Sequence, residues 1–256
     1  GASSISLCAV LVAIVLGATA LYRELELKTL FPILARPIFR HEYLVGKYLG
    51  TLLTLVVFIA IDGAVVLGIL ALETGARASA VLGAGAALLV LLGVLLLRFR
   101  RVRVHVVVPW ALASFATMAA LASPAGADRQ LVVASCALTL GEAAIITAVA
   151  TLFSSFSSPF LTAVFTLSVF LIGRSADTLA HLPARQVGTT VKHAAGALAR
   201  VMPNLQVYVP ARPILLGQVP GISTWHLVAK ASAQSLAYSV VMLAVAALVF
   251  RRRDFS

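Results

Sequence analysis

The length of its apolar runs is the feature that most constrains this chain. A helix needs about 20 residues to cross about 30 Å of hydrocarbon, and about seven stretches approach that length. The runs are continuous rather than alternating, which favours helices over barrel strands. At 61% hydrophobic residues, the chain is too apolar for one soluble core. The sequence therefore predicts an all-α, polytopic membrane protein with about seven transmembrane helices. The predicted spans are residues 4–22, 43–72, 78–97, 104–121, 130–153, 160–173 and 227–250.

The basic residues indicate orientation rather than nucleic-acid binding. A formal net charge of +11 would suggest nucleic acid for a soluble chain, but in a membrane protein Lys and Arg mark cytoplasmic joins. Most of them lie in residues 23–47, 98–103 and 251–253. This distribution predicts an external amino end, an internal carboxyl end, and contact of the last arginines with membrane lipids. Cys8 and Cys136 fall in apolar runs, so both are expected in the core.

A charged segment separates the first two runs and has the pattern of an interfacial helix. Four of its apolar residues recur at i, i+3, i+4 and i+7, with charged residues around the stripe. Two prolines, Pro32 and Pro37, should shorten or break this helix before a new one begins near Phe39. The apolar residues are Leu27, Leu30, Phe31 and Leu34.

The same segment resembles the cytoplasmic signature of ABC-2 type permeases, the membrane subunits of bacterial ABC exporters. Three later stretches are also similar to that family: residues 153–173, Met202-Pro203-Asn204-Leu205 before the last span, and the carboxy-terminal residues 250–255. The signature residues are 24–29, Leu34-Ala35-Arg36-Pro37, Arg40 and Gly46-Lys47-Tyr48-Leu49-Gly50.

The resemblance implies one permease domain over residues 1–256, multi-pass in the bacterial cytoplasmic (inner) membrane. Residues 23–42 would be a short cytoplasmic coupling region that contacts a separate ABC ATPase subunit. A second permease copy, identical or related, would complete the exporter. ATP and Mg²⁺ would bind the ATPase, and no cofactor is expected in this chain. The expected polar contacts are Glu24, Glu26, Lys28, Arg36 and Arg40, with Leu27, Phe31 and Leu34 as the buried stripe.

The chain departs from the family in two places. The family's first transmembrane helix would precede residue 1, so we expect it to be missing here. Residues 78–127 hold two extra apolar runs, which form either an inserted transmembrane hairpin with a basic tip or a pair of re-entrant segments. Independently of the resemblance, we expect residues 174–226 to form a long extracytoplasmic segment. We expect a surface helix near residues 187–202 there, followed by an extended, proline-rich stretch.

Catalytic and metal-binding patterns are missing from the sequence. Gly46-Lys47 is no Walker A loop, because Tyr48 replaces the Ser or Thr and His41 replaces the first Gly. The sequence contains no zincin motif and no G-x-S-x-G elbow. Three histidines in the outer segment are too widely spaced for a metal site: His181, His193 and His226. We therefore expect a permease that is not an enzyme. The alternative is a non-transporting scaffold or a subunit of a membrane enzyme complex.

Two carboxylates fall inside predicted spans, Asp62 and Glu142. Burying such a charge costs on the order of 3 kcal/mol, so each should face the bundle interior, a partner or water. They form part of a translocation path, or they make structural hydrogen bonds between helices. The serines at 154–158, followed by Pro159, predict a tight turn in which hydroxyl groups cap the helices.

Overall fold

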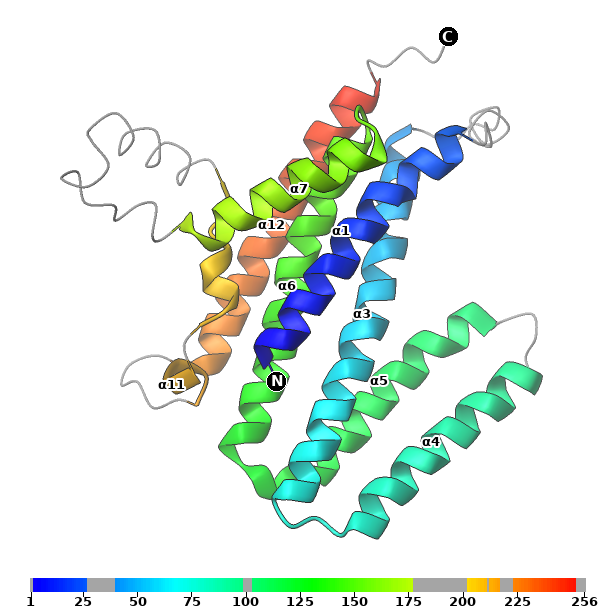
Figure 1. Ribbon diagram of the computed structural model, residues 1–256, viewed down its shortest axis with the longest axis vertical. Coiled ribbons are helices and arrows are strands. Elements are labelled where there is room, and N and C mark those ends of the chain that lie inside the picture. The colour runs from blue at the N-terminus through cyan, green and yellow to red at the C-terminus, as the bar shows by residue number, and fades with distance from the viewer. Residues whose placement is uncertain are drawn as a thin grey trace, which may run out of the picture. The chain divides into compact units, whose positions relative to one another are not determined.

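The computed structural model describes residues 2–26, 40–98, 103–176, 202–210, 212–216 and 223–251. Within these ranges it contains helices and turns and no strand (Figure 1). Every predicted span is part of a helix. The long helices are α1 (Ala2–Glu26), α3 (Arg40–Glu73), α4 (Ala78–Arg98), α5 (Arg103–Leu121), α6 (Ala127–Ser154), α7 (Pro159–Arg174) and α12 (Thr224–Arg251). The short ones are η1 (Ser123–Ala125), η2 (Leu205–Tyr208) and α11 (Arg212–Leu215).

The helices confirm a polytopic, all-α membrane protein. Four of them are long and apolar enough to cross a bilayer, over His41–Glu73, Ala78–Arg98, Ala127–Ser154 and Thr224–Phe250. The other three predicted spans are shorter apolar helices, over Ser4–Thr19, His105–Leu121 and Pro159–Arg174.

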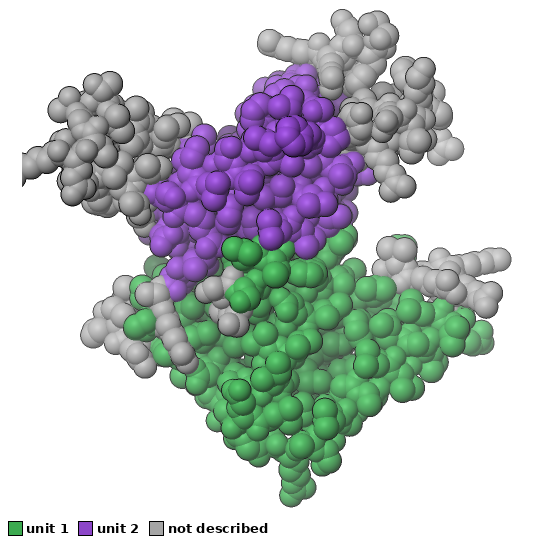
Figure 2. Space-filling view, viewed as in Figure 1, with its two compact units in different colours: residues 1–9, 53–140, 211–229 green, residues 10–52, 141–210, 230–256 purple. Residues whose placement is uncertain are grey.

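The chain divides into two compact units, which Figure 2 shows in green and purple. Four long helices, α1, α3, α6 and α12, contribute residues to both. Unit 1 comprises Gly1–Ala9, Leu53–Leu140 and Ala211–Ala229, and unit 2 comprises Val10–Leu52, Gly141–Pro210 and Lys230–Ser256.

Unit 1 contains α4 and α5, two continuous helices within residues 78–127. The indole N–H of Trp110 on α5 donates to the carbonyl of Leu88 on α4 at 2.8 Å. Gly75, with φ +90°, makes the turn between α3 and α4, a conformation that favours glycine. At about 1.5 Å per residue, 21 and 19 residues each reach close to 30 Å. These lengths suit the hairpin better than re-entrant segments, and the hairpin stays a prediction.

Unit 2 brings helices close together through small residues and exposes apolar ones. A Cβ at Gly17 on α1 would lie 2.5 Å from the Cβ of Ala150 on α6, so only glycine allows this approach. The buried face of α7 carries Thr162 and Thr166, whereas Phe160 on the same helix is exposed. A core of Leu44, Ala246 and Phe250 joins α3 to α12. Small residues at helix contacts and apolar side chains on the exposed surface suit a lipid environment.

The serine turn differs in detail from the capping prediction. The hydroxyls of Ser154, Ser155 and Ser157 donate to carbonyls in the last turn of α6, at 3.0, 2.6 and 2.7 Å. Ser158 is the N-cap residue of α7, but its side chain makes no capping hydrogen bond. The serines therefore satisfy the carbonyl end of α6, because those carbonyls have no partner within the helix.

In its described parts, residues 202–210 and 212–216, the proline-rich stretch contains helical turns, whereas an extended chain was expected. Residues 205–208 form η2, which begins where the side chain of Asn204 accepts a hydrogen bond from the backbone N–H of Gln206 at 3.0 Å. Residues 212–215 form α11, whose Pro213 lies in the first turn, where proline is tolerated. The surface helix predicted near residues 187–202 lies outside the described residues, apart from Met202.

The two cysteines also differ from each other. Cys136 on α6 is buried, as expected, whereas Cys8 on α1 is exposed. An apolar run does not distinguish the inner face of a membrane helix from its lipid-facing side, because both are apolar.

Candidate functional site

A buried ion pair joins α6 to α7. The Nε of Arg174 donates to Oε1 of Glu142 at 2.7 Å, and Nη2 donates to Oε2 at 2.9 Å. Such bidentate, charge-assisted pairs are among the strongest side-chain hydrogen bonds. Glu142 is completely buried, whereas the side chain of Arg174 is 25% exposed. The guanidinium also lies 5.2 Å from the centre of the Phe170 ring, a cation–π distance. The carboxylate of Glu142 is therefore neutralised inside the bundle.

Gly141 and Gly173 immediately precede Glu142 and Arg174, and they leave room for η2 and the residues just before it. A Cβ at Gly141 would lie 2.9 Å from the Tyr208 ring, and one at Gly173 would lie 2.8 Å from the carbonyl oxygen of Pro203. Real Cβ atoms do not approach so closely, so η2 packs there only because both positions lack a side chain. The segment thus lies directly beside the residues that carry the ion pair.

The same segment is bound to α12. The hydroxyl of Tyr208 donates to the backbone carbonyl of Ala231 at 2.9 Å. Burial raises the pKa of Tyr208 to about 12, so the side chain remains a neutral donor at physiological pH. Residues 202–208, the ion pair and three helices therefore form one continuous set of contacts within unit 2.

Asp62 has a different environment from Glu142. It lies on α3 in unit 1 and is half-buried. Among the residues that the structure describes, it makes neither a hydrogen bond nor an ion pair. It immediately precedes Gly63, where an added Cβ would lie 2.8 Å from the thiol sulfur of Cys136. Asp62 is therefore a charged residue within an apolar helix, and no described side chain pairs with its carboxylate.

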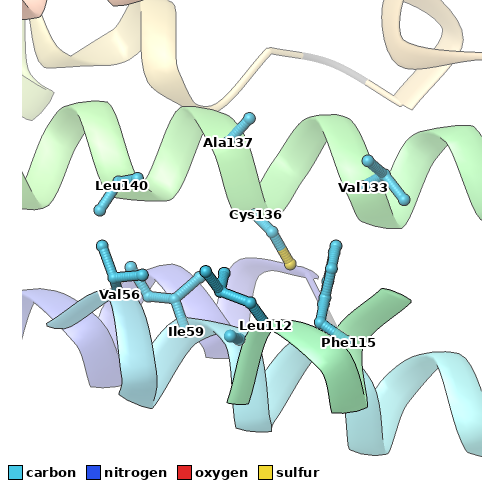
Figure 3. Close-up of a pocket in the computed structure, with 9 residues that line it drawn as sticks. Val56, Ile59, Leu112, Phe115, Val133, Cys136, Ala137 and Leu140 are labelled. Carbon is cyan, nitrogen blue, oxygen red and sulfur yellow. The ribbon is translucent and has the colours of Figure 1, made fainter. Parts of the chain in front are cut away.

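A pocket of about 190 Å³ lies between α3, α5 and α6, and Cys136 is one of its lining residues. Figure 3 shows the Cys136 side chain pointing from α6 toward the side chains of the two facing helices. Apart from the Cys136 thiol, its lining side chains are hydrocarbon. They are Val56, Ile59 and Ala60 of α3, Leu112 and Phe115 of α5, and Val133, Cys136, Ala137 and Leu140 of α6.

The comparisons with known proteins identify the family. The family model described as ABC-2 family transporter protein matches residues 2–255. The chain belongs to the ABC-2 transporter family. No curated protein and no solved structure matches it. Together with its apolar helices, this makes the chain a multi-pass permease subunit of an ABC transporter.

Membership has two further consequences for the ABC-2 permease. Membrane domains of this family generally work with an ABC ATPase and are generally not enzymes themselves. The matched residues include 78–127, so α4 and α5 lie inside the family region.

The coupling residues of the ABC-2 permease are described only in part. Glu24 and Glu26 lie in the last turn of α1, and Arg40 is the first residue of α3, close to the start predicted near Phe39. The other predicted contacts lie outside the described residues: Leu27, Lys28, Phe31, Leu34 and Arg36. Their role in ATPase binding stays a prediction.

The sequence interpretation of the ABC-2 permease missed Arg174 as the partner of Glu142 and missed η2 altogether. Arg174 had been assigned to the outer segment, although it is the last residue of α7. A signal was present, because an intramembrane acid needs a partner and Arg174 immediately follows a predicted span. The structure places Glu142 and Asp62 in different units. A translocation role for either stays a prediction, and the ion pair favours the structural alternative for Glu142.

Metal ligands are not gathered in the described part of the ABC-2 permease. No group of three or more His, Cys, Asp or Glu side chains is placed to hold an ion in those ranges. His226 lies on α12, whereas His181 and His193 fall outside the described residues.

Proposed function

We propose that this permease exports a substrate across the bacterial cytoplasmic membrane, driven by ATP hydrolysis on separate ATPase subunits. The observation that carries the proposal is the family match over residues 2–255. The charged segment between the first two apolar runs supports it, because such a segment suits a cytoplasmic partner. ATP and Mg²⁺ would bind the ATPase, since this sequence has no Walker A loop.

The coupling mechanism follows from how the segment is attached to the helices. Residues 27–39 connect α1, which ends at Glu26, directly to α3, which begins at Arg40. A force applied to so short a connection would act on both helices at once. Movement of the ATPase dimer would then change the tilt of the spans and open the path alternately to each side. A second permease copy, identical or related, would form the other wall of that path.

A substitution in the coupling segment tests the proposal. Phe31→Asp places a charge in the apolar stripe expected to contact the ATPase, and Phe31→Leu keeps the stripe apolar. The ATPase subunits of the source genome would be co-expressed with the tagged chain. We expect them to co-purify with wild type and with Phe31→Leu. We expect Phe31→Asp to remain in the membrane and to lose the ATPase.

Two outcomes would count against the proposal. In the first, Phe31→Asp retains the ATPase at the wild-type level, which removes the coupling role from this stripe. In the second, wild-type chain retains no ATPase and instead retains a different cytoplasmic protein, which would favour the scaffold alternative.

A further inference from the structure

The pocket between α3, α5 and α6 has the size and chemistry of a small apolar binding site. Its volume is about 190 Å³, and an apolar cavity of about 150 Å³ is enough to bind benzene and stays dry when empty. One aromatic ring or a short alkyl chain would therefore fill it. The hydrocarbon lining offers no strong hydrogen-bonding partner, so the group that enters must itself be apolar.

The walls of the pocket are held at a fixed spacing by a close helix contact. A Cβ at Gly63 on α3 would lie 2.7 Å from the Phe115 ring on α5 and 2.8 Å from the thiol sulfur of Cys136 on α6. Because Gly63 has no side chain, α3 can approach both Phe115 on α5 and Cys136 on α6 at this position. All nine lining residues belong to unit 1. The pocket is therefore preformed within one unit, as small-molecule sites usually are.

An acidic residue, Asp62, lies next to the pocket along α3, although it is not one of the lining residues. Asp62 immediately precedes Gly63 and follows the lining residue Ile59 by three positions, so it lies near the same face of α3. Asp62 is half-buried and has no hydrogen bond or ion pair to any described residue. A charge inside a span costs on the order of 3 kcal/mol unless it is paired. A bound cation would supply that pairing.

We propose that this pocket binds a small lipophilic cation, with its ring or short alkyl chain between α3, α5 and α6 and its ammonium group against Asp62. Apolar volume and charge complementarity together select this class over neutral or anionic molecules of the same shape. The inference goes beyond the proposed function, because binding requires neither ATP nor an ATPase subunit. Leu112 and Phe115 on α5 lie within residues 78–127, so this part of the chain completes the pocket.

Three probes of one shape test the charge preference on the wild-type chain. Phenylbutylammonium, phenylbutanol and phenylbutyrate share a ring and a linker and differ in the charge of the head group. Each would be equilibrated by dialysis with the full chain in nanodiscs of zwitterionic lipid, and partition into empty nanodiscs would be subtracted. We expect the ammonium probe to bind about tenfold more tightly than the alcohol, the size of one charge-assisted hydrogen bond, and the carboxylate probe to bind most weakly.

Variants separate the two parts of the site. Asp62→Asn should remove the preference for the cation and leave binding of the alcohol unchanged. Ala137→Phe fills the pocket and should abolish binding of both. Glu73→Gln is the matched control for charge, because Glu73 is an exposed acid at the end of the same helix. Leu89→Phe, on the exposed face of α4, is the control for an added ring. Both controls should bind as wild type does.

The proposal is overturned if the three probes bind wild type equally, or if Asp62→Asn keeps the preference for the cation. Undiminished binding to folded Ala137→Phe would also overturn it. Size-exclusion chromatography would identify a variant that does not fold. In that case the comparison of the three probes on the wild-type chain still tests whether the pocket prefers a cation.

Discussion

Replacing Arg174 with methionine should destabilise the chain by about 3–5 kcal/mol, the usual cost of removing one partner from a buried ion pair. Two hydrogen bonds, of 2.7 and 2.9 Å, join its guanidinium to a carboxylate that is completely buried. Methionine is apolar and matches the aliphatic stem of arginine, so contact with Phe170 on the same helix is largely kept. The loss therefore reports mainly the removal of this cation from Glu142.

Removing the carboxylate should cost less. In Glu142→Gln the guanidinium loses its counter-charge, but its side chain is already 25% exposed and can turn toward water or lipid headgroups. We expect a loss of about 1–3 kcal/mol. In the double variant Glu142→Gln with Arg174→Met, neither charge is buried, and stability should return to within about 1 kcal/mol of wild type.

The assay is equilibrium unfolding of the purified chain in mixed micelles, followed by circular dichroism, for wild type, both single variants and the double variant. Arg174→Lys serves as a matched control, because lysine keeps the charge but cannot donate two parallel hydrogen bonds. We expect it to fall between wild type and Arg174→Met. If the two single losses simply add in the double variant, or if Arg174→Met unfolds as wild type does, the ion pair does not stabilise the bundle.

Two further predictions concern η2. Gly173→Val places a Cβ 2.8 Å from the carbonyl oxygen of Pro203, so amide hydrogen exchange in residues 202–210 should become faster. Gly93→Val on α4, where an added Cβ meets nothing within 4 Å, should not change it, and unchanged exchange in Gly173→Val would refute the packing argument. Tyr208 has a pKa raised from 10.0 to about 12, so its contribution to stability is complete below pH 10 and is lost as the pH rises toward 12. The unfolding temperature of wild type should fall across that pH window more steeply than that of Tyr208→Phe. Parallel pH profiles for the two proteins would contradict the stabilising role of the Tyr208 hydroxyl.

The sequence by itself determined the class of protein and the position of its helices. Apolar length is a local property, because each stretch near residues 4–22 or 227–250 needs lipid rather than a particular neighbour to become a helix. For the same reason the sequence identified Asp62 and Glu142 as charges inside spans. It could not predict how each would be accommodated, since that depends on groups distant along the chain.

Only the tertiary structure decided the partners of these residues. Arg174, 32 positions from Glu142, forms the ion pair because α7 lies against α6. The proline-rich stretch was wrongly expected to be extended, because prolines disfavour a continuous helix but leave single helical turns possible. The turn η2 is held by contacts with Gly141, Gly173 and Ala231. The apolar pocket likewise exists only where three helices meet at Gly63, because a cavity is a property of packing rather than of any one segment.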